Sequence, residues 1–373
     1  MKKVIAAGHI CLDITPVFQD NKRVERLGDV LSPGKLIQMG NADVHTGGSV
    51  ANTGLAMKIL GADVTLMGKM GDDEFGGMAR KILKSYRAEE GMLTVSGEST
   101  SYSIILAVPG IDRIVLHNPG ANDTFCADDV PELSLKDCAL FHFGYPTLMK
   151  KMYESEGNDL QRILKKVKMA GAATSLDFAL VNPETEAGQA DWEMILEKTL
   201  PYVDFFVPSV EELCFMLDRE RFKSWQKRAK GRDITKILDI ETDIKPLAEQ
   251  CMSFGAKVLL IKCGAPGIYF KTADFRVLRG ISERVELDVQ EWSDKEGFEK
   301  SYIPERILSG NGAGDTSIAA FLTAMLEGYS IERCMHLAAA AGASCVAAYD
   351  ALSGLKPLNE LEDRINRGWD KCD

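Results

Sequence analysis

A run of small residues in the last quarter of the chain is the segment best suited to binding an anion. Residues 309–316 read Ser-Gly-Asn-Gly-Ala-Gly-Asp-Thr, and an apolar stretch with helical periodicity follows at once. Small residues before a helix N-terminus allow consecutive backbone N–H groups to converge on an anion, with the helix dipole behind them. Asp315 falls in the first helical turn, where its carboxylate could act on a ligand or simply cap the helix.

Two other kinds of phosphate-binding loop do not match this segment. The sequence contains no G-x-x-x-x-G-K-[ST] pattern, which excludes a P-loop nucleotide-binding protein. The glycines are spaced G-x-G-x-G rather than G-x-G-x-x-G, which argues against a dinucleotide-binding turn. Taken alone, the segment is more typical of a glycine-rich turn with an aspartate cap than of a site.

A second group of candidate residues lies near the N-terminus. Gly47 and Gly48 precede a predicted helix, and paired glycines let the backbone approach a ligand closely. Asn52 adds a donor and an acceptor one turn into that helix. Residues 68–76 then form a turn-rich entry to the next helix. Each segment alone is compatible with an ordinary strand-to-helix connection.

Three histidines are candidate metal ligands. His45, His117 and His142 lack metal-ligand spacing, so we expect structural or substrate-contacting roles. His45 lies two residues before Gly47, so it could touch a substrate.

The elements that must position these residues follow a β-α rhythm. Short apolar runs alternate with helix-period stretches, which predicts an α/β fold around a mostly parallel sheet. Several runs are continuously apolar, as expected for strands covered on both faces. The predicted strands are 4–11, 64–67, 139–143, 174–178, 205–207 and 258–261.

Two stretches break this rhythm. Residues 15–43 and 94–116 have an extended or hairpin character, and they could pair into a small β lid or remain two ordinary hairpins. The α/β core would then comprise residues 1–14, 44–93 and 117–373. We also expect the acidic stretch 283–300 to be a flexible loop close to the ligand.

The composition limits the class of protein. The chain has 373 residues, of which 45% are hydrophobic, and its net charge of −11 argues against nucleic acid or an anionic membrane as partner. Its nine cysteines are irregularly spaced and include no C-x-x-C pair, which indicates reduced thiols in a cytoplasmic protein. No stretch has the length and apolarity of a membrane span.

Together and in this order, the motifs resemble those of the PfkB family of carbohydrate kinases, which have the ribokinase-like fold. Residues 47–52 and 68–76 are similar to the N-terminal signature of that family, and residues 311–316 are similar to its C-terminal signature. Two further elements between them, 118–122 and 262–267, also match. The resemblance implies a doubly wound, mostly parallel sheet with helices on both faces and a small β lid.

The resemblance also implies an activity and a role for each matching residue. The activity is ATP-dependent phosphorylation of a sugar hydroxyl with Mg²⁺, in which Asp315 is the base. The anion hole is formed by the backbone amides of Gly312, Ala313 and Gly314. The residues expected at the substrate are Asp13, Gly47, Gly48, Asn52 and Asn122. The residues expected at the nucleotide are Lys262, Gly264, Gly267 and Asn311.

Two positions depart from the family pattern. Ser309 stands where an aspartate usually helps to hold a monovalent cation, so activation by K⁺ is in doubt. Ser209 replaces the asparagine of an N-x-x-E motif, while Glu212 is retained and is expected to order Mg²⁺ through water. The alternative for Glu212 is a solvated charge at a helix start.

Three functions stay open at this point. The first is a sugar kinase of the ribokinase or fructokinase type, and the second is a nucleoside kinase on the same fold. The third is a catalytically weak sugar-binding or regulatory relative, suggested by Ser209 and Ser309. A homodimer formed through the lids is a further implication of the resemblance.

Overall fold

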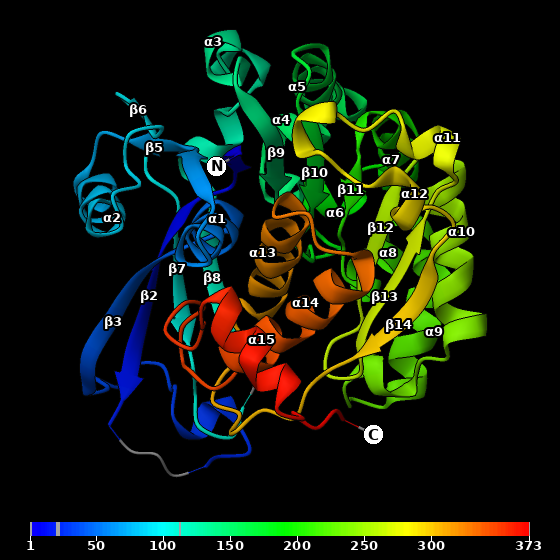
Figure 1. Ribbon diagram of the computed structural model, residues 1–373. Coiled ribbons are helices and arrows are strands. Elements are labelled where there is room, and N and C mark those ends of the chain that lie inside the picture. The colour runs from blue at the N-terminus through cyan, green and yellow to red at the C-terminus, as the bar shows by residue number, and fades with distance from the viewer. Residues whose placement is uncertain (1, 20–22, 112, 373) are drawn as a thin grey trace.

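The computed structural model describes residues 2–19, 23–111 and 113–372, so positions 20–22 and 112 of the two predicted lid stretches lie outside the described residues. A central eight-stranded sheet carries helices on both faces, and a separate four-stranded sheet lies beside it (Figure 1). The α/β prediction is therefore confirmed.

The central sheet has the strand order β14-β13-β12-β11-β10-β9-β1-β4. The six strands from β12 to β4 run parallel to one another. Beyond β12, β13 pairs antiparallel to β12, and the edge strand β14 pairs antiparallel to β13. Every residue of β9 is buried, which agrees with its continuous apolar run. In sequence order the strands are β1 (Lys3–Gly8), β4 (Asp63–Met67), β9 (Cys138–Gly144), β10 (Ala173–Asp177), β11 (Phe205–Phe206), β12 (Val258–Lys262), β13 (Gly267–Thr272) and β14 (Glu296–Lys300).

Two of the predicted segments are corrected. The strand predicted over 4–11 is two strands, because β1 ends at Gly8 and the chain then enters the other sheet. The Asn122 side chain takes both backbone hydrogen bonds of Ile10, at 3.2 and 2.9 Å, and so interrupts the ladder there. The loop predicted over 283–300 is also wrong, since it ends in the edge strand β14, where Glu296 pairs with Lys271 at 2.6 Å.

Helices cover the two faces of the sheet and enclose two apolar clusters. Alternate residues of β12 face opposite clusters, with Val258 and Leu260 in one and Leu259 and Ile261 in the other. The first cluster includes residues of α1 (Ser49–Ile59), α13 (Ala313–Leu326), α14 (Ile331–Cys345) and α15 (Leu358–Asn366). The second includes residues of α5 (Asn158–Met169), α7 (Trp192–Thr199), α8 (Val210–Leu217), α9 (Arg219–Ala229) and α10 (Lys245–Ser253).

Further elements complete the core. They are α2 (Glu74–Ser85), α3 (Glu132–Leu135), α4 (Lys150–Tyr153), α6 (Glu186–Gln189), α11 (Phe275–Leu278), α12 (Val289–Trp292) and the strand pair β5 (Lys69–Gly71) and β6 (Leu93–Val95). Among the residues that the structure describes, no helix combines the length and apolarity needed to cross a bilayer.

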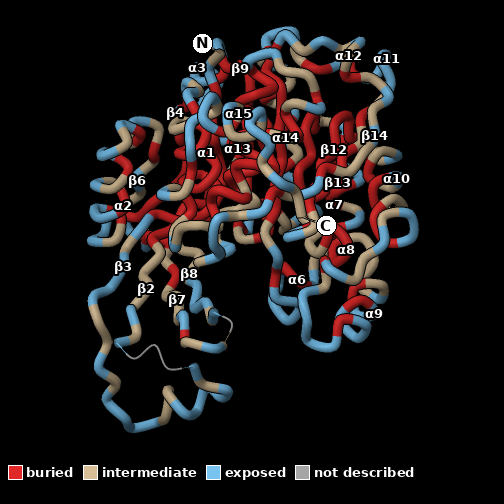
Figure 2. Tube along the Cα trace, turned by 60° about the horizontal axis from the view of Figure 1, so that its bottom comes forward, coloured by how far each residue is buried: buried red, intermediate tan, exposed pale blue. Residues whose placement is uncertain are grey.

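The second sheet, called the lid sheet below, has the order β3-β2-β7-β8. Its strands are β2 (Cys11–Phe18), β3 (Met39–Gly47), β7 (Tyr102–Leu106) and β8 (Ile114–Asn118). The two irregular stretches thus join in one sheet, which reaches a few residues beyond the predicted limits. Its strands are largely half-buried or exposed, whereas the inner strands of the central sheet, such as β9 and β10, are buried (Figure 2). The division of the chain into core and lid stays a prediction.

Candidate active site

The glycine-rich segment forms the start of α13. Gly312 is the N-cap, with φ of 72°, and a Cβ atom at this position would lie 2.2 Å from Cβ of Ala351. Both facts require glycine. The first intrahelical bond runs from the Thr316 amide to the Gly312 carbonyl. The N–H groups of residues 312–315 therefore have no helical carbonyl to bond, as at any helix start.

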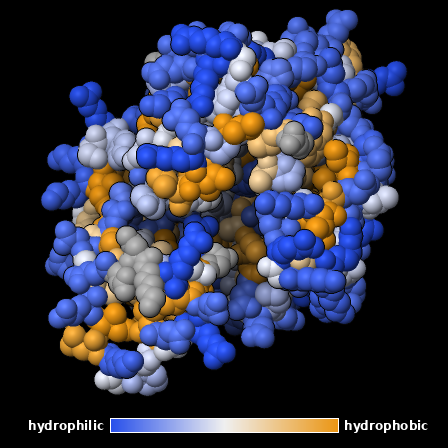
Figure 3. Space-filling view, turned by 90° about the horizontal axis from the view of Figure 1, so that it is seen from below, coloured by the Kyte–Doolittle hydropathy of each residue, from blue (hydrophilic) through white to orange (hydrophobic). Residues whose placement is uncertain are grey.

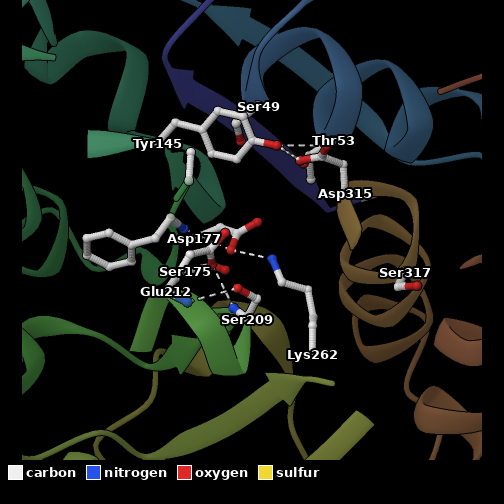
Figure 4. Close-up of polar contacts among 12 residues, drawn as sticks. Ser49, Thr53, Tyr145, Ser175, Asp177, Ser209, Glu212, Lys262, Asp315 and Ser317 are labelled. Carbon is white, nitrogen blue, oxygen red and sulfur yellow. Dashed lines mark hydrogen bonds and ion pairs between the residues drawn. The ribbon is translucent and has the colours of Figure 1, made fainter. Parts of the chain in front are cut away.

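The Asp315 carboxylate turns away from its own helix and is not a cap. It is 4% exposed and accepts hydrogen bonds from Asn52 Nδ2 and Thr53 Oγ1 of α1, both at 3.1 Å. The Tyr145 hydroxyl donates to the same carboxylate, at 2.7 Å from Oδ1 and 2.8 Å from Oδ2 (Figure 4). The carboxylate is thus fixed in one orientation at the start of α13, where the Ala313 amide makes only a long bond of 3.4 Å to the Gly310 carbonyl.

Tyr145 follows the carboxyl end of β9. Its backbone is left-handed, with φ of 64° and ψ of 44°, and its amide donates to the Asp177 carbonyl at 3.0 Å. Burial, together with the nearby negative charges of Asp315 and Asp177, holds the pKa of the Tyr145 hydroxyl well above its usual value. Tyr145 therefore remains a proton donor.

An ion pair lies next to this network. Lys262, at the end of β12, places Nζ 2.6 Å from Asp177 Oδ1 at the end of β10, and Asp177 is fully buried. The lysine also reaches the first turn of α13, since a Cβ atom on Gly314 would lie 3.7 Å from its Nζ. The amides of that turn and the ammonium group thus face the same space.

The charges around Lys262 do not balance. Burial raises the pKa of Asp177. Burial by itself would lower the pKa of Lys262, but the negative charges of Asp177 and Glu212 outweigh this effect, so the pKa of Lys262 is raised. Asp177, Glu212 and Asp315 all interact electrostatically with this one ammonium group. The site therefore carries an excess of carboxylate charge.

Glu212 belongs to a capping box at the start of α8. Its Oε2 accepts from the Ser209 amide at 2.7 Å, while Ser209 Oγ accepts from the Glu212 amide at 3.2 Å (Figure 4). The glutamate is half-buried, and burial raises its pKa, with Lys262 opposing. It is therefore not the solvated charge that we considered as its alternative.

These carboxylates fit a magnesium ion that is shared with phosphate groups. The Asp177 Oδ2 atom is buried and has no hydrogen-bond partner within the described part of the chain. No cluster of three ligating side chains occurs there either. Mg²⁺ in nucleotide sites is typically held by one or two carboxylates together with phosphates and water, so Asp177 and Glu212 suffice.

The opposite wall of the site comes from the lid sheet. Strand register places His45, Asp13, Ser103 and His117 side by side across its four strands, and we call these residues the lid row. Asp13 Oδ1 accepts from Cys11 Sγ at 3.2 Å, and Ser103 Oγ lies 3.1 Å from His117 Nδ1. Burial raises the pKa of Asp13, with partial compensation from its neighbours.

The predicted substrate residues near α1 lie beside this row. A Cβ atom on Gly47 would lie 2.1 Å from Asp13 Oδ2, so the carboxylate packs directly over the glycine. Gly48 is the N-cap of α1, and Asn52 is bonded to Asp315. The structure thus brings Asp13, the glycine pair and Asp315 together.

The histidines have different surroundings. His45 is exposed and pairs with Asp43 at 2.7 Å. His117 Nε2 lies 3.3 Å from the buried His9, whose pKa is lowered to about 3 by burial and by His117. His142 is fully buried between Ser49 and Ser175, and burial lowers its pKa to about 3. His142 is therefore structural.

Four predicted residues lie elsewhere or are otherwise engaged. The Asn122 side chain is fully buried and bonds to the backbone of Ile10 and Pro119, so its geometry argues against contact with a substrate. Gly267 begins β13, and Gly264 packs against Thr235. The Asn311 amide donates to Ser309 Oγ at 3.1 Å, which places this serine in the turn before α13.

Sequence reasoning missed three residues of the site. Asp177 ends a correctly predicted strand, and a polar residue at that point is a usable signal in a parallel sheet. Tyr145 is likewise a polar residue at the carboxyl end of a strand, since it directly follows β9, the neighbour of β10 in the sheet. Thr53 stands beside the predicted Asn52 but belongs to no recognised motif.

All these groups lie toward the carboxyl ends of the parallel strands. Figure 3 views the molecule from that side, and the surface is hollowed near its middle. In open α/β sheets this end of the strands is where ligands bind.

Comparisons with known proteins agree with this geometry. Residues 1–357 match the model of the pfkB family carbohydrate kinases. An uncharacterized sugar kinase of Archaeoglobus fulgidus is 26% identical over 81% of this chain and 98% of its own length. A probable fructokinase-2 of Arabidopsis thaliana is 24% identical over 88% of this chain and 83% of its own length.

Solved structures show the same fold. The ribokinase of Arabidopsis thaliana complexed with ribose and ATP has a TM-score of 0.68 at 19% identity, covering 97% of this chain and 98% of its own. A putative ribokinase II of E. coli in complex with ATP and Mg²⁺ has a TM-score of 0.68 at 20% identity, covering 98% and 100%. The ribokinase-like fold is thus confirmed, and the chain belongs to the pfkB family of carbohydrate kinases, which are phosphotransferases.

Proposed function

We propose that this protein transfers the γ-phosphoryl group of ATP to a hydroxyl of a sugar, with Asp315 as the base. One observation carries the proposal. The buried Asp315 carboxylate is fixed in the first turn of α13, whose amides have no partner within the helix, with the lid row on the opposite side. A base, an anion-binding turn and a polar wall are what this transfer needs.

In the proposed reaction the acceptor oxygen attacks the γ-phosphorus, its proton passes to Asp315, and the bond from the γ-phosphorus to the β-phosphate oxygen breaks to release ADP. The transition state is loose, so orientation and charge stabilisation matter more than a strong base. The amides of Gly312, Ala313 and Gly314 would donate to the transferring group, and Lys262 would bring a positive charge to it. We infer that the nucleotide lies along the end of β12 and the turn that contains Gly264.

Asp177 and Glu212 would hold Mg²⁺, with Glu212 acting through water. The bound ion would neutralise charge on the phosphates. Ser209 can still bond a metal-bound water through its hydroxyl, although it already caps α8. For K⁺, the Ser309 hydroxyl offers no charge, so we expect turnover to change little when Na⁺ replaces K⁺.

The acceptor would be held by the lid row, chiefly Asp13 and His117. These groups can exchange hydrogen bonds with several hydroxyls of a sugar. The curated relatives described above are named as a sugar kinase and a fructokinase, which supports a sugar rather than a nucleoside.

The lid sheet is also a proposed dimer contact. It exposes the apolar side chains of Val17, Val115 and Leu116, each about half exposed. Sedimentation velocity on the wild type and on Leu116→Glu tests this, since a lid dimer should dissociate in the variant.

The decisive experiment measures ADP release from Mg-ATP over a panel of sugars and nucleosides. Asp315→Asn should lower kcat for the best sugar roughly 10²- to 10⁴-fold, as removal of a general base does. Asp137→Asn is the matched control, because Asp137 is an exposed carboxylate that pairs with Lys3 at the other end of the sheet. Turnover of nucleosides alone would change the substrate class, and sugar binding without turnover would indicate a binding protein.

A further inference from the structure

The Tyr145 hydroxyl occupies the positions on Asp315 that an attacking hydroxyl needs. A carboxylate offers about four lone-pair sites. Tyr145 lies 2.7 and 2.8 Å from the two oxygens, Thr53 bonds Oδ1 and Asn52 bonds Oδ2. The one Tyr145 proton is shared between the two oxygens, so the phenol stands in front of both of them, and an acceptor can reach the carboxylate from that side only by displacing it.

Tyr145 is the donor that can leave. Asn52 and Thr53 are buried in the first turns of α1, which packs against α13. Tyr145 lies beyond the end of β9 and is half-buried. Its backbone is held by the bond to Asp177, so its side chain can swing without moving a helix.

The phenol also approaches from the acceptor's side. Its ring centroid lies 6.2 Å from that of His9, which contacts His117 of the lid row. Figure 4 shows the Tyr145 hydroxyl pointing to the Asp315 carboxylate. The hydroxyl thus lies between the base and the wall that we assign to the sugar.

We propose that Tyr145 is a positioning residue whose hydroxyl stands in for the acceptor hydroxyl, keeping water off Asp315 until a sugar displaces it. This inference rests on the proposed function. Phosphotransferases must suppress transfer to water, which is far more abundant than any sugar. The raised pKa of Tyr145 keeps it protonated and therefore a poor nucleophile itself.

Removal of the hydroxyl opens this position to water. The water oxygen then bonds to the γ-phosphorus, Asp315 takes the proton, and the bond to the β-phosphate oxygen breaks. The products are ADP and inorganic phosphate. We expect Tyr145→Phe to raise ATP hydrolysis without acceptor about tenfold. It should also lower the KM for the sugar a few-fold, because the hydrogen bond from Tyr145 to the charged Asp315 no longer competes with the bond from the sugar hydroxyl.

The test measures phosphate release from Mg-ATP without sugar, in four variants. Tyr145→Phe and Tyr145→Leu should both hydrolyse ATP faster than the wild type, and Tyr145→Phe with Asp315→Asn should not. Tyr329→Phe is the matched control, since it loses another phenol–carboxylate bond, to Glu362 at 3.1 Å, beyond the far end of α13. Circular dichroism checks that each variant is folded.

A rise that requires Asp315 supports the placeholder role. Unchanged or slower hydrolysis in both Tyr145 variants overturns it, as does a higher KM for the sugar in Tyr145→Phe. Failure of the wild type to phosphorylate any sugar would overturn the proposed function instead, and the comparison of hydrolysis rates would still decide the role of Tyr145.

Discussion

The α13 side and the lid side of the site hold their functional groups in different ways. On the α13 side, Asp315 and Asp177 are at most 4% exposed, and each is bonded to residues from other elements. On the lid side, Asp13 is only half-buried, in a sheet whose strands β3 and β8 are mostly exposed. The phosphoryl-transfer groups are therefore fixed by the core. The acceptor groups lie on a partly exposed sheet, where we expect substitutions to change the free energy of unfolding little.

The largest effect is expected on the α13 side. Lys262→Met should lower kcat roughly 10²- to 10³-fold, as loss of one transition-state donor does. It should also lower the free energy of unfolding by about 3–5 kcal/mol, because the Asp177 carboxylate is left buried without its partner. Steady-state kinetics and urea unfolding measure the two effects.

A double variant provides the control. Lys262→Met with Asp177→Asn removes both charges and should recover most of the stability but none of the activity. Recovery of activity would mean that Lys262 serves only to neutralise Asp177.

On the lid side the effect should fall on binding. Asp13→Asn should lower kcat/KM for the sugar roughly a hundredfold, or about 2.7 kcal/mol, with the KM for ATP unchanged. Its folded-state pKa is raised, so stability is lost as pH rises from the unfolded value through the folded one. The variant should thus be at least as stable as the wild type at pH 7. A loss of stability at that pH would contradict the contrast between the two sides.

The core histidine gives a smaller effect, seen as a pH dependence. The pKa of His142 is lowered to about 3, so its contribution to stability is present above the unfolded value and is lost as pH falls from about 6.5 toward 3. The slope is about 1.4 kcal/mol per pH unit for one such group. His142→Gln should flatten the dependence of the urea midpoint on pH.

The smallest effect concerns the capping box. Ser209→Ala should cost about 1 kcal/mol, as loss of an N-cap does. Ser209→Asn should keep the cap and lower the Mg²⁺ concentration that gives half-maximal rate. An unchanged Mg²⁺ dependence would mean that position 209 serves α8 alone.

Local motifs could be predicted from the sequence, and long-range contacts could not. The turn before α13 also packs against Ala351, but its own residues form a recognisable pattern, so Asp315 and its glycines could be found from their spacing. The bond between Tyr145 and Asp315 joins residues 170 positions apart, and the Lys262–Asp177 pair spans 85 positions. Neither Tyr145 nor Asp177 lies in a motif that indicates such a contact.

Asn122 shows the opposite difficulty, and its contact with a substrate stays a prediction. Its motif pointed to a substrate, but its amide satisfies the backbone of Ile10, at a distance of 112 positions. A side chain that ends one strand ladder looks the same in sequence as one that binds a ligand. The edge strand β14 was missed for a related reason, because its outward residues are as polar as those of a loop.

The connections between the two sheets have a mechanical consequence. Only His9 and Ile10 separate β1 from β2, and Gly48 alone separates β3 from α1. Two adjacent strands of the lid sheet are thus tied to the core by tethers of one or two residues, so the sheet can tilt about them but cannot slide away. One tether is the residue directly before α1, the helix that carries Asn52 and Thr53. A displacement of the acceptor wall would therefore be passed directly to the helix that orients the base.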